Sequence, residues 1–231
     1  MSDRSRWFVT TEWLAGHLDD PSVIVLDGSW YLPTANRDPR AEYRDKHIPG
    51  AVFFDIDEVS DKTSTLPHML PSARDFARMV GALGVGDGMK IVVYDSAGLW
   101  TAARVWWTFR VFGAPDIVIL EGGLPQWIAE GRPLESGAGE ARPAKTFTAK
   151  FNPKMVSDMA DVQKRVVTGR GAVVDGRPAD RFYGKAAEPR QGVPSGHIPG
   201  SSSLPSSDFV SGGKLKDDAE LAMLFERAGV D

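Results

Sequence analysis

The sequence contains no cysteine among its 231 residues. That absence excludes disulfide bonds, thiolate metal sites and a cysteine nucleophile within the chain itself. An excess of charge of one sign is missing too, because 27 basic and 31 acidic residues leave a formal net charge of −4. Nucleic acids and anionic membrane surfaces need a concentrated basic face, so this balance predicts neither as a partner.

Long apolar runs are also missing, and none approaches the length of a membrane span. The opening residues MSDRSRW lack the apolar stretch and the small-residue cleavage site of a secretory signal. We therefore expect a cytoplasmic protein with no membrane partner. The 4 histidines lack a ligand spacing such as His-x-x-x-His, so no metal site is predicted.

What the sequence does contain is one pattern that occurs twice. The tetrapeptide HIPG at residues 47–50 returns at residues 197–200. Further segments match in the same order, namely residues 23–28 with 172–176, 40–43 with 179–182, and 75–85 with 219–230. These ordered matches predict a tandem duplication. Because the histidine of the HIPG turn occurs in both copies, we assign it a structural role.

The first copy has the pattern of alternating strands and helices. Buried strands are expected where short runs rich in Val and Ile stand between turn residues, at 23–27, 91–94 and 117–120. Helices are expected from the cap Ser72 to Gly84, over residues 101–112 and around residues 124–130. The aromatic side chains of the second of these helices are interpreted as core packing. The alternation predicts an α/β fold, with a parallel sheet flanked by helices on both faces.

We expect two tandem α/β domains of this kind, the second of them incomplete. The first spans residues 1–134, and residues 135–155 form a linker that opens with a stretch rich in Gly, Pro, Ala and Ser. The second domain, residues 156–231, lacks counterparts of residues 88–132 of the first copy. Such a half-domain would leave apolar edges exposed, so we expect the chain to be part of a longer protein.

Short motifs follow one another along the chain: DGSW at 27–30, the two HIPG turns, SDKTS at 60–64, PHMLP at 67–71, RVWW at 104–107 and GGLPQW at 122–127. Together they resemble the tandem-domain rhodanese and 3-mercaptopyruvate sulfurtransferase family over nearly the whole chain. The resemblance implies two similar α/β domains with an active site between them. It also implies a catalytic cysteine after a central strand of the second domain, expected beyond residue 231. Asp95 occupies the matching place in the first domain, which is therefore expected to be non-catalytic.

The resemblance further implies the site residues. Arg181 and Arg190 match two arginines that bind the carboxylate of 3-mercaptopyruvate, a task that suits the planar guanidinium fork. Asp57 and His68 match an aspartate and a histidine that have been proposed to assist proton transfer with a serine of the cysteine loop. From the residues alone, the arginine-rich stretch also fits a solvated loop. Asp57 and His68 equally fit a pair that ties down the loop between the domains.

We therefore expect a sulfurtransferase that moves sulfane sulfur from 3-mercaptopyruvate, or secondarily thiosulfate, through a cysteine persulfide. The acceptor is expected to be cyanide, a thiol or a thioredoxin-like protein, and no cofactor is needed. The chain of 231 residues itself is expected to be inactive because it has no cysteine. Two alternatives stay open. One is a non-catalytic rhodanese-like binding or regulatory module, and the other is a cysteine phosphatase with a longer phosphate-holding loop.

Overall fold

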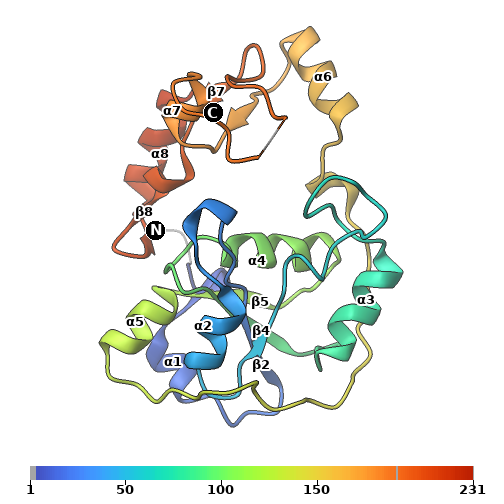
Figure 1. Ribbon diagram of the computed structural model, residues 1–231, viewed down its shortest axis with the longest axis vertical. Helices are drawn as coiled ribbons and strands as arrows, with labels where there is room; N and C mark the ends of the chain where they lie inside the picture. The colour runs from blue at the N-terminus through green and yellow to red at the C-terminus, as the bar shows by residue number, and fades with distance from the viewer. Residues whose placement is uncertain (1–3, 191, 231) are drawn as a thin grey trace.

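The computed structural model describes residues 4–190 and 192–230, so the outermost residues of both predicted domains lie outside the described part. The chain forms a larger first body and a smaller second body, which lie below and above in Figure 1. The first body contains a five-stranded sheet of order β1-β5-β4-β2-β3. Its strands are β1 (Phe8–Val9), β2 (Val23–Asp27), β3 (Val52–Phe53), β4 (Lys90–Tyr94) and β5 (Ile117–Leu120). Every pairing in this sheet is parallel, as predicted.

Helices α1 (Thr11–Ala15), α2 (Pro39–Asp45), α3 (Ala73–Ala82), α4 (Ala102–Val111) and α5 (Gly123–Ala129) belong to the first body and connect or flank these strands. Helices α6 (Met159–Thr168), α7 (Ala179–Phe182) and α8 (Asp218–Arg227) come later in the chain, outside this sheet. The three helices expected in the first copy are α3, α4 and α5. Ser72 caps α3 by accepting a hydrogen bond from the backbone N–H of Asp75, and Gly84 follows its end at a φ of +85°. In the described part of the chain, no helix is long and apolar enough to cross a membrane.

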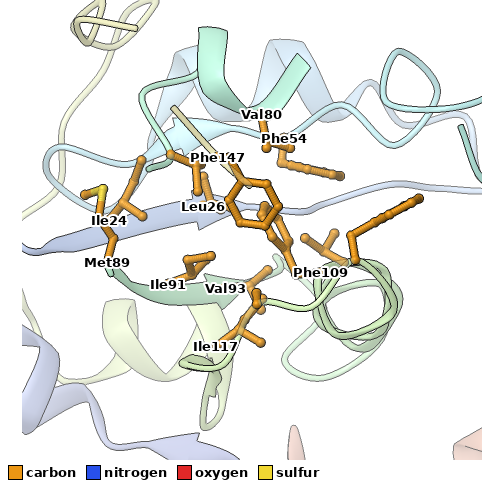
Figure 2. Packing of buried hydrophobic residues seen from close by; sticks show 14 of the residues in the cluster. Ile24, Leu26, Phe54, Val80, Met89, Ile91, Val93, Phe109, Ile117 and Phe147 are labelled. Atoms are coloured by element: carbon orange, nitrogen blue, oxygen red, sulfur yellow. The ribbon is translucent and has the colours of Figure 1, made fainter. Parts of the chain in front are cut away.

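Each face of the sheet has its own apolar layer. Because neighbouring strand residues point to opposite faces, Ile24 and Leu26 join one layer while Val23 and Val25 join the other. The first layer, shown in Figure 2, packs against α3 and α4 through Phe76, Val80, Val105 and Phe109. The second layer packs against α1, α2 and α5 through Leu14, Tyr43, Leu124 and Trp127. The predicted cover on both faces is therefore confirmed.

The segment after α5 runs along the first body without regular helix or strand up to residue 152. The backbone N–H groups of Glu135 and His47 each donate to the other residue's carbonyl at 2.9 Å. Phe147 is 7% exposed and belongs to the apolar layer of Phe76 and Phe109, with ring centroids 5.6 and 5.9 Å away. The region predicted as a linker thus contributes a side chain to the first core, and the domain boundaries at 134 and 155 stay a prediction.

The second body repeats the start of the first. Strand β6 (Val174–Asp175) pairs in parallel with β7 (Ser202–Ser203), as β2 pairs with β3. An antiparallel hairpin follows, formed by β8 (Val210–Ser211) and β9 (Lys214–Leu215). Val174 is 40% exposed, whereas every residue of β2 is buried. Strand β6 is therefore less covered than its counterpart β2.

The HIPG histidine has the same surroundings in both copies. His47 Nδ1 lies 2.7 Å from the carbonyl oxygen of Tyr43, and its ring stacks on Tyr43 at 4.0 Å. His197 Nδ1 lies 2.9 Å from the carbonyl oxygen of Phe182, and its ring stacks on Phe182 at 3.9 Å. The repeated geometry supports both the duplication and the structural role of these histidines.

Candidate functional site

Asp57 and His68, which are 11 positions apart in the sequence, meet at the edge of the first body. Asp57 follows β3 in a turn that Asp55 closes by accepting the N–H groups of Asp57 and Glu58. His68 Nδ1 lies 3.0 Å from Asp57 Oδ1, although the ring N–H is not aligned for a hydrogen bond. Trp30 donates from Nε1 to Asp57 Oδ2 at 2.9 Å, and its ring meets the imidazole edge-on at 4.8 Å. The structure therefore brings the two predicted residues together.

The imidazole of His68 has a lowered pKa. Desolvation by burial is the largest cause, and the charges of Arg190 and Arg104 act in the same direction. The carboxylate of Asp57 opposes them by favouring the protonated ring. The net direction keeps the imidazole neutral at pH 7, the state in which a histidine can accept a proton.

A cavity of about 540 Å³ opens beside His68, between the two bodies. The first body contributes Trp30, Ile56, His68, Leu99, Trp100 and Arg104 among others, and the second contributes Ser206, Phe209, Val210 and Leu215. The lining is mostly apolar with a few polar groups, which is typical of a small-molecule site. A neighbouring hollow of about 610 Å³ shares His68 and Arg104 with it.

The two predicted arginines have different surroundings. The guanidinium of Arg181 binds the carboxylate of Glu188, whose pKa is lowered chiefly by that hydrogen bond. Glu188 also accepts from Arg177 at 2.8 Å. Arg190 is exposed and makes no hydrogen bond or ion pair with residues 4–190 or 192–230. Its positive charge nevertheless contributes to the lowered pKa of His68. Neither Arg181 nor Arg190 is among the described residues that line the cavity.

Asp95 comes directly after β4, and the following loop surrounds its carboxylate. Its oxygens accept the backbone N–H groups of Ala97, Gly98, Trp100 and Ala102 at 2.6 to 2.9 Å. The side chain is 1% exposed. A fully hydrogen-bonded, buried carboxylate cannot carry a sulfane sulfur, which supports the expectation that the first domain is non-catalytic.

The second body contacts the first at this same loop. A Cβ atom on Gly98 would come within 2.8 Å of the Cα of Gly213, which lies between β8 and β9. Gly98 also has a φ of +104°, which disfavours any side chain at this position. Arg4 adds a second contact by donating to the carbonyl oxygen of Leu215 at 3.2 Å and to Asp218 at 3.1 Å.

Comparison with known proteins identifies the family and the fold to which the chain is similar. Residues 10–130 match the rhodanese-like domain family. Human 3-mercaptopyruvate sulfurtransferase is 43% identical over 233 residues, which cover 98% of this chain and 78% of that protein. Bovine thiosulfate sulfurtransferase is 40% identical over 234 residues, with coverages of 98% and 78%. A crystal structure of SseA from Escherichia coli, described as a 3-mercaptopyruvate sulfotransferase with the rhodanese fold, matches with a TM-score of 0.90. The two chains are 40% identical, and the match covers 97% of this chain and 84% of that one.

The parallel sheet, its flanking helices and these matches define a protein of the rhodanese fold. Within that class, the chain belongs to the 3-mercaptopyruvate sulfurtransferase family. It spans 78% of the length of the human relative and contains no cysteine. The predicted family is confirmed, whereas the roles of Asp57, His68, Arg181 and Arg190 stay predictions. Trp30 and Arg104 were missed as site residues, although both lie within motifs that carried the resemblance.

Proposed function

We propose that this chain recognises the sulfur donor of a sulfurtransferase, with 3-mercaptopyruvate as the first candidate and thiosulfate as the second. The observation that carries the proposal is the Asp57–His68 pair, which lies beside a cavity between the bodies and within reach of the charge of Arg190. A neutral imidazole beside a carboxylate can take a proton from a thiol or a hydroxyl group and return it to a leaving group. Family membership supports sulfur transfer as the chemistry that this pair would assist.

The chain's own residues would bind and orient the donor. Arg190 offers an exposed guanidinium that pairs with none of residues 4–190 and 192–230, and a donor carboxylate could replace Glu188 on Arg181. The sulfur-accepting step needs a thiolate that these 231 residues do not contain. Transfer of the sulfur onward, to cyanide, a thiol or a thioredoxin-like protein, therefore needs a persulfide on a cysteine outside them. The cytoplasm stays the proposed compartment, on the sequence argument alone.

Calorimetric titration of the 231-residue protein with 3-mercaptopyruvate, pyruvate and thiosulfate tests donor recognition. Arg190→Gln should weaken 3-mercaptopyruvate binding roughly tenfold or more, because a hydrogen bond to a charged group contributes about 1.5–3 kcal/mol. Arg170→Gln is the matched control, since Arg170 is an exposed arginine of the same body outside the predicted site. Equal binding by both variants would refute the role of Arg190. Sulfur transfer from 3-mercaptopyruvate to cyanide by the purified chain would contradict the dependence on a cysteine.

A non-catalytic binding module is the second candidate, and the absence of cysteine favours it. The same titration separates the two candidates. If a folded chain binds none of the three small molecules, donor recognition is excluded and the binding module is supported. Binding of 3-mercaptopyruvate that depends on Arg190 supports donor recognition instead.

A further inference from the structure

The backbone at His68 has a conformation that is uncommon for residues with a Cβ atom. Its φ is +58°, in the left-handed region that side chains with a Cβ rarely adopt. Such a conformation is strained, so contacts with neighbouring groups must hold it in place. This conformation is coupled to the site because His68 carries the imidazole that contacts Asp57.

Arg104, on the first turn of α4, is the group that holds this backbone. Its Nη2 donates to the carbonyl oxygen of His68 at 2.5 Å. Its guanidinium lies over the ring of Trp107, 4.8 Å from the centroid. Together these contacts connect the loop of His68 to α4, a helix of 10 residues.

Partial burial of the Arg104 guanidinium would destabilise the fold if the side chain made no compensating contacts. The side chain is half-buried, and desolvation lowers the pKa of its guanidinium. In the described part of the chain, no carboxylate forms an ion pair with it. A cation removed from water without a counter-charge destabilises a fold unless its hydrogen bonds compensate. Arg104 uses its position to fix one carbonyl group, that of His68.

We propose that Arg104 is a positioning residue for the candidate site: it fixes the left-handed turn at His68, so that the imidazole is held against Asp57 and Trp30. The inference rests on the proposed function, because the orientation of His68 matters only if a donor binds at this site. Its geometry does not depend on which donor binds.

The charged groups that face His68 are Asp57, Arg104 and Arg190. Removing the charge of Arg104 removes one of the two cations that disfavour the imidazolium. The pKa of His68 should therefore rise in a variant without that charge and stay low in a variant that keeps it.

The experiment is an NMR titration of the histidine rings in the full 231-residue chain. The protein has 4 histidines, and His68→Gln assigns the signal of His68. Arg104→Met keeps an unbranched apolar side chain over Trp107 but removes the charge and the donors. We expect it to raise the pKa of His68 and to abolish the nuclear Overhauser effects between the rings of His68 and Trp30. Arg104→Lys keeps the charge and one donor toward the carbonyl, so it should restore both readouts at least in part.

Arg110→Met is the matched control. Arg110 lies on the same helix, stacks over Trp106 at 5.9 Å and donates to the carbonyl oxygen of Pro115 at 3.1 Å. Its loss should lower thermal stability without changing either His68 readout. If Arg104→Met leaves both readouts at their wild-type values, or if Arg110→Met changes them equally, the positioning role is wrong.

This result is independent of the proposed function, because the NMR readouts require neither donor nor turnover. A chain that binds no 3-mercaptopyruvate would refute the donor site while the His68 geometry still responded to Arg104→Met. Should Arg104→Met fail to fold, Arg104→Gln, which removes the charge but keeps a polar side chain, and Trp30→Phe decide the matter. A loss of the ring contacts in Arg104→Gln, with Trp30→Phe leaving the His68 backbone signals in place, supports the role of Arg104. Wild-type ring contacts in Arg104→Gln would overturn it, and displaced His68 backbone signals in Trp30→Phe would then assign the positioning to Trp30.

Discussion

Asp27 is the last residue of β2 and Asp95 directly follows the neighbouring strand β4. Both are buried, but their carboxylates have different surroundings. Asp95 accepts hydrogen bonds from the backbone N–H groups of the loop that follows it. Asp27 is 2% exposed and accepts the N–H of Ser29 at 2.9 Å. Burial raises the pKa of Asp27, and the nearby charge of Asp95 adds to the effect. Burial of the ionised Asp27 carboxylate therefore destabilises the native state, and the size of this destabilisation depends on pH.

Replacing Asp27 by Asn should remove that destabilisation. A carboxyl with a raised native pKa destabilises the fold as pH rises from its unfolded value, about 3.9, through the native value. The amide oxygen of Asn can still accept the N–H of Ser29 but carries no charge. The free energy of unfolding of Asp27→Asn, measured in urea between about pH 4 and pH 8, should increase relative to wild type as pH rises.

Asp87→Asn is the control of opposite sign. Hydrogen bonds from Thr148 lower the pKa of Asp87, so its charged form stabilises the native state above its unfolded pKa. Relative to wild type, this variant should lose stability as pH rises through the acid range. Parallel pH profiles for wild type and Asp27→Asn would contradict the assignment of Asp27.

Sequence patterns identified one half of the candidate site and missed the other. His68 could be named because it lies in the PHMLP motif, and Asp57 because it matches an aspartate that the family has upstream of that motif. Their partners Trp30 and Arg104 lie 27 and 36 positions away from the groups that they contact, and such contacts leave no local pattern. Sequence reasoning also could not predict that Arg181 forms an ion pair while Arg190 is exposed, because the pairing of Arg181 depends on where Glu188 lies in the folded loop.

At the scale of elements, the segment after α5 is a part of the first body. Phe147→Ala should lower the free energy of unfolding of this body by about 3 kcal/mol, because it removes an aromatic ring from the layer shown in Figure 2. Phe151→Ala is the control, since Phe151 is 48% exposed and should cost less than about 1 kcal/mol. Urea unfolding followed by tryptophan fluorescence gives both values. A cost for Phe147→Ala no larger than that of the control would show that residues 135–155 act as a free linker.

Most elements recovered from the sequence have enough residues to show a continuous apolar run or a helical period. Strands β2, β4 and β5 and helices α3 and α4 have four or more residues with a clear apolar pattern. Strands β1 and β3 have two residues each and exist through their pairing with β5 and β2. Because that pairing is set by the whole sheet, local sequence could not predict it.

At the scale of the whole molecule, two bodies enclose the candidate cavity, so its shape depends on how firmly they are joined. The β8–β9 hairpin supplies Val210 and Leu215 to the lining and rests with Gly213 on the loop of Asp95. Arg4 reaches from the start of the first body to the end of this hairpin. The docking of the hairpin therefore couples the N-terminal segment to the cavity wall.

Arg4→Met should loosen the hairpin without unfolding the first body. The variant loses the hydrogen bonds to Leu215, Lys216 and Asp218. We expect amide hydrogen exchange in residues 210–216 to become roughly tenfold faster, because a hydrogen bond from a charged group contributes about 1.5–3 kcal/mol and the pair is partly solvated. Arg6→Met is the control, since Arg6 lies over Trp7 at 5.4 Å within the first body. Equal exchange rates in the two variants would show that Arg4 does not hold the hairpin in place, and faster exchange throughout the β-sheet would show that Arg4 stabilises the first body instead.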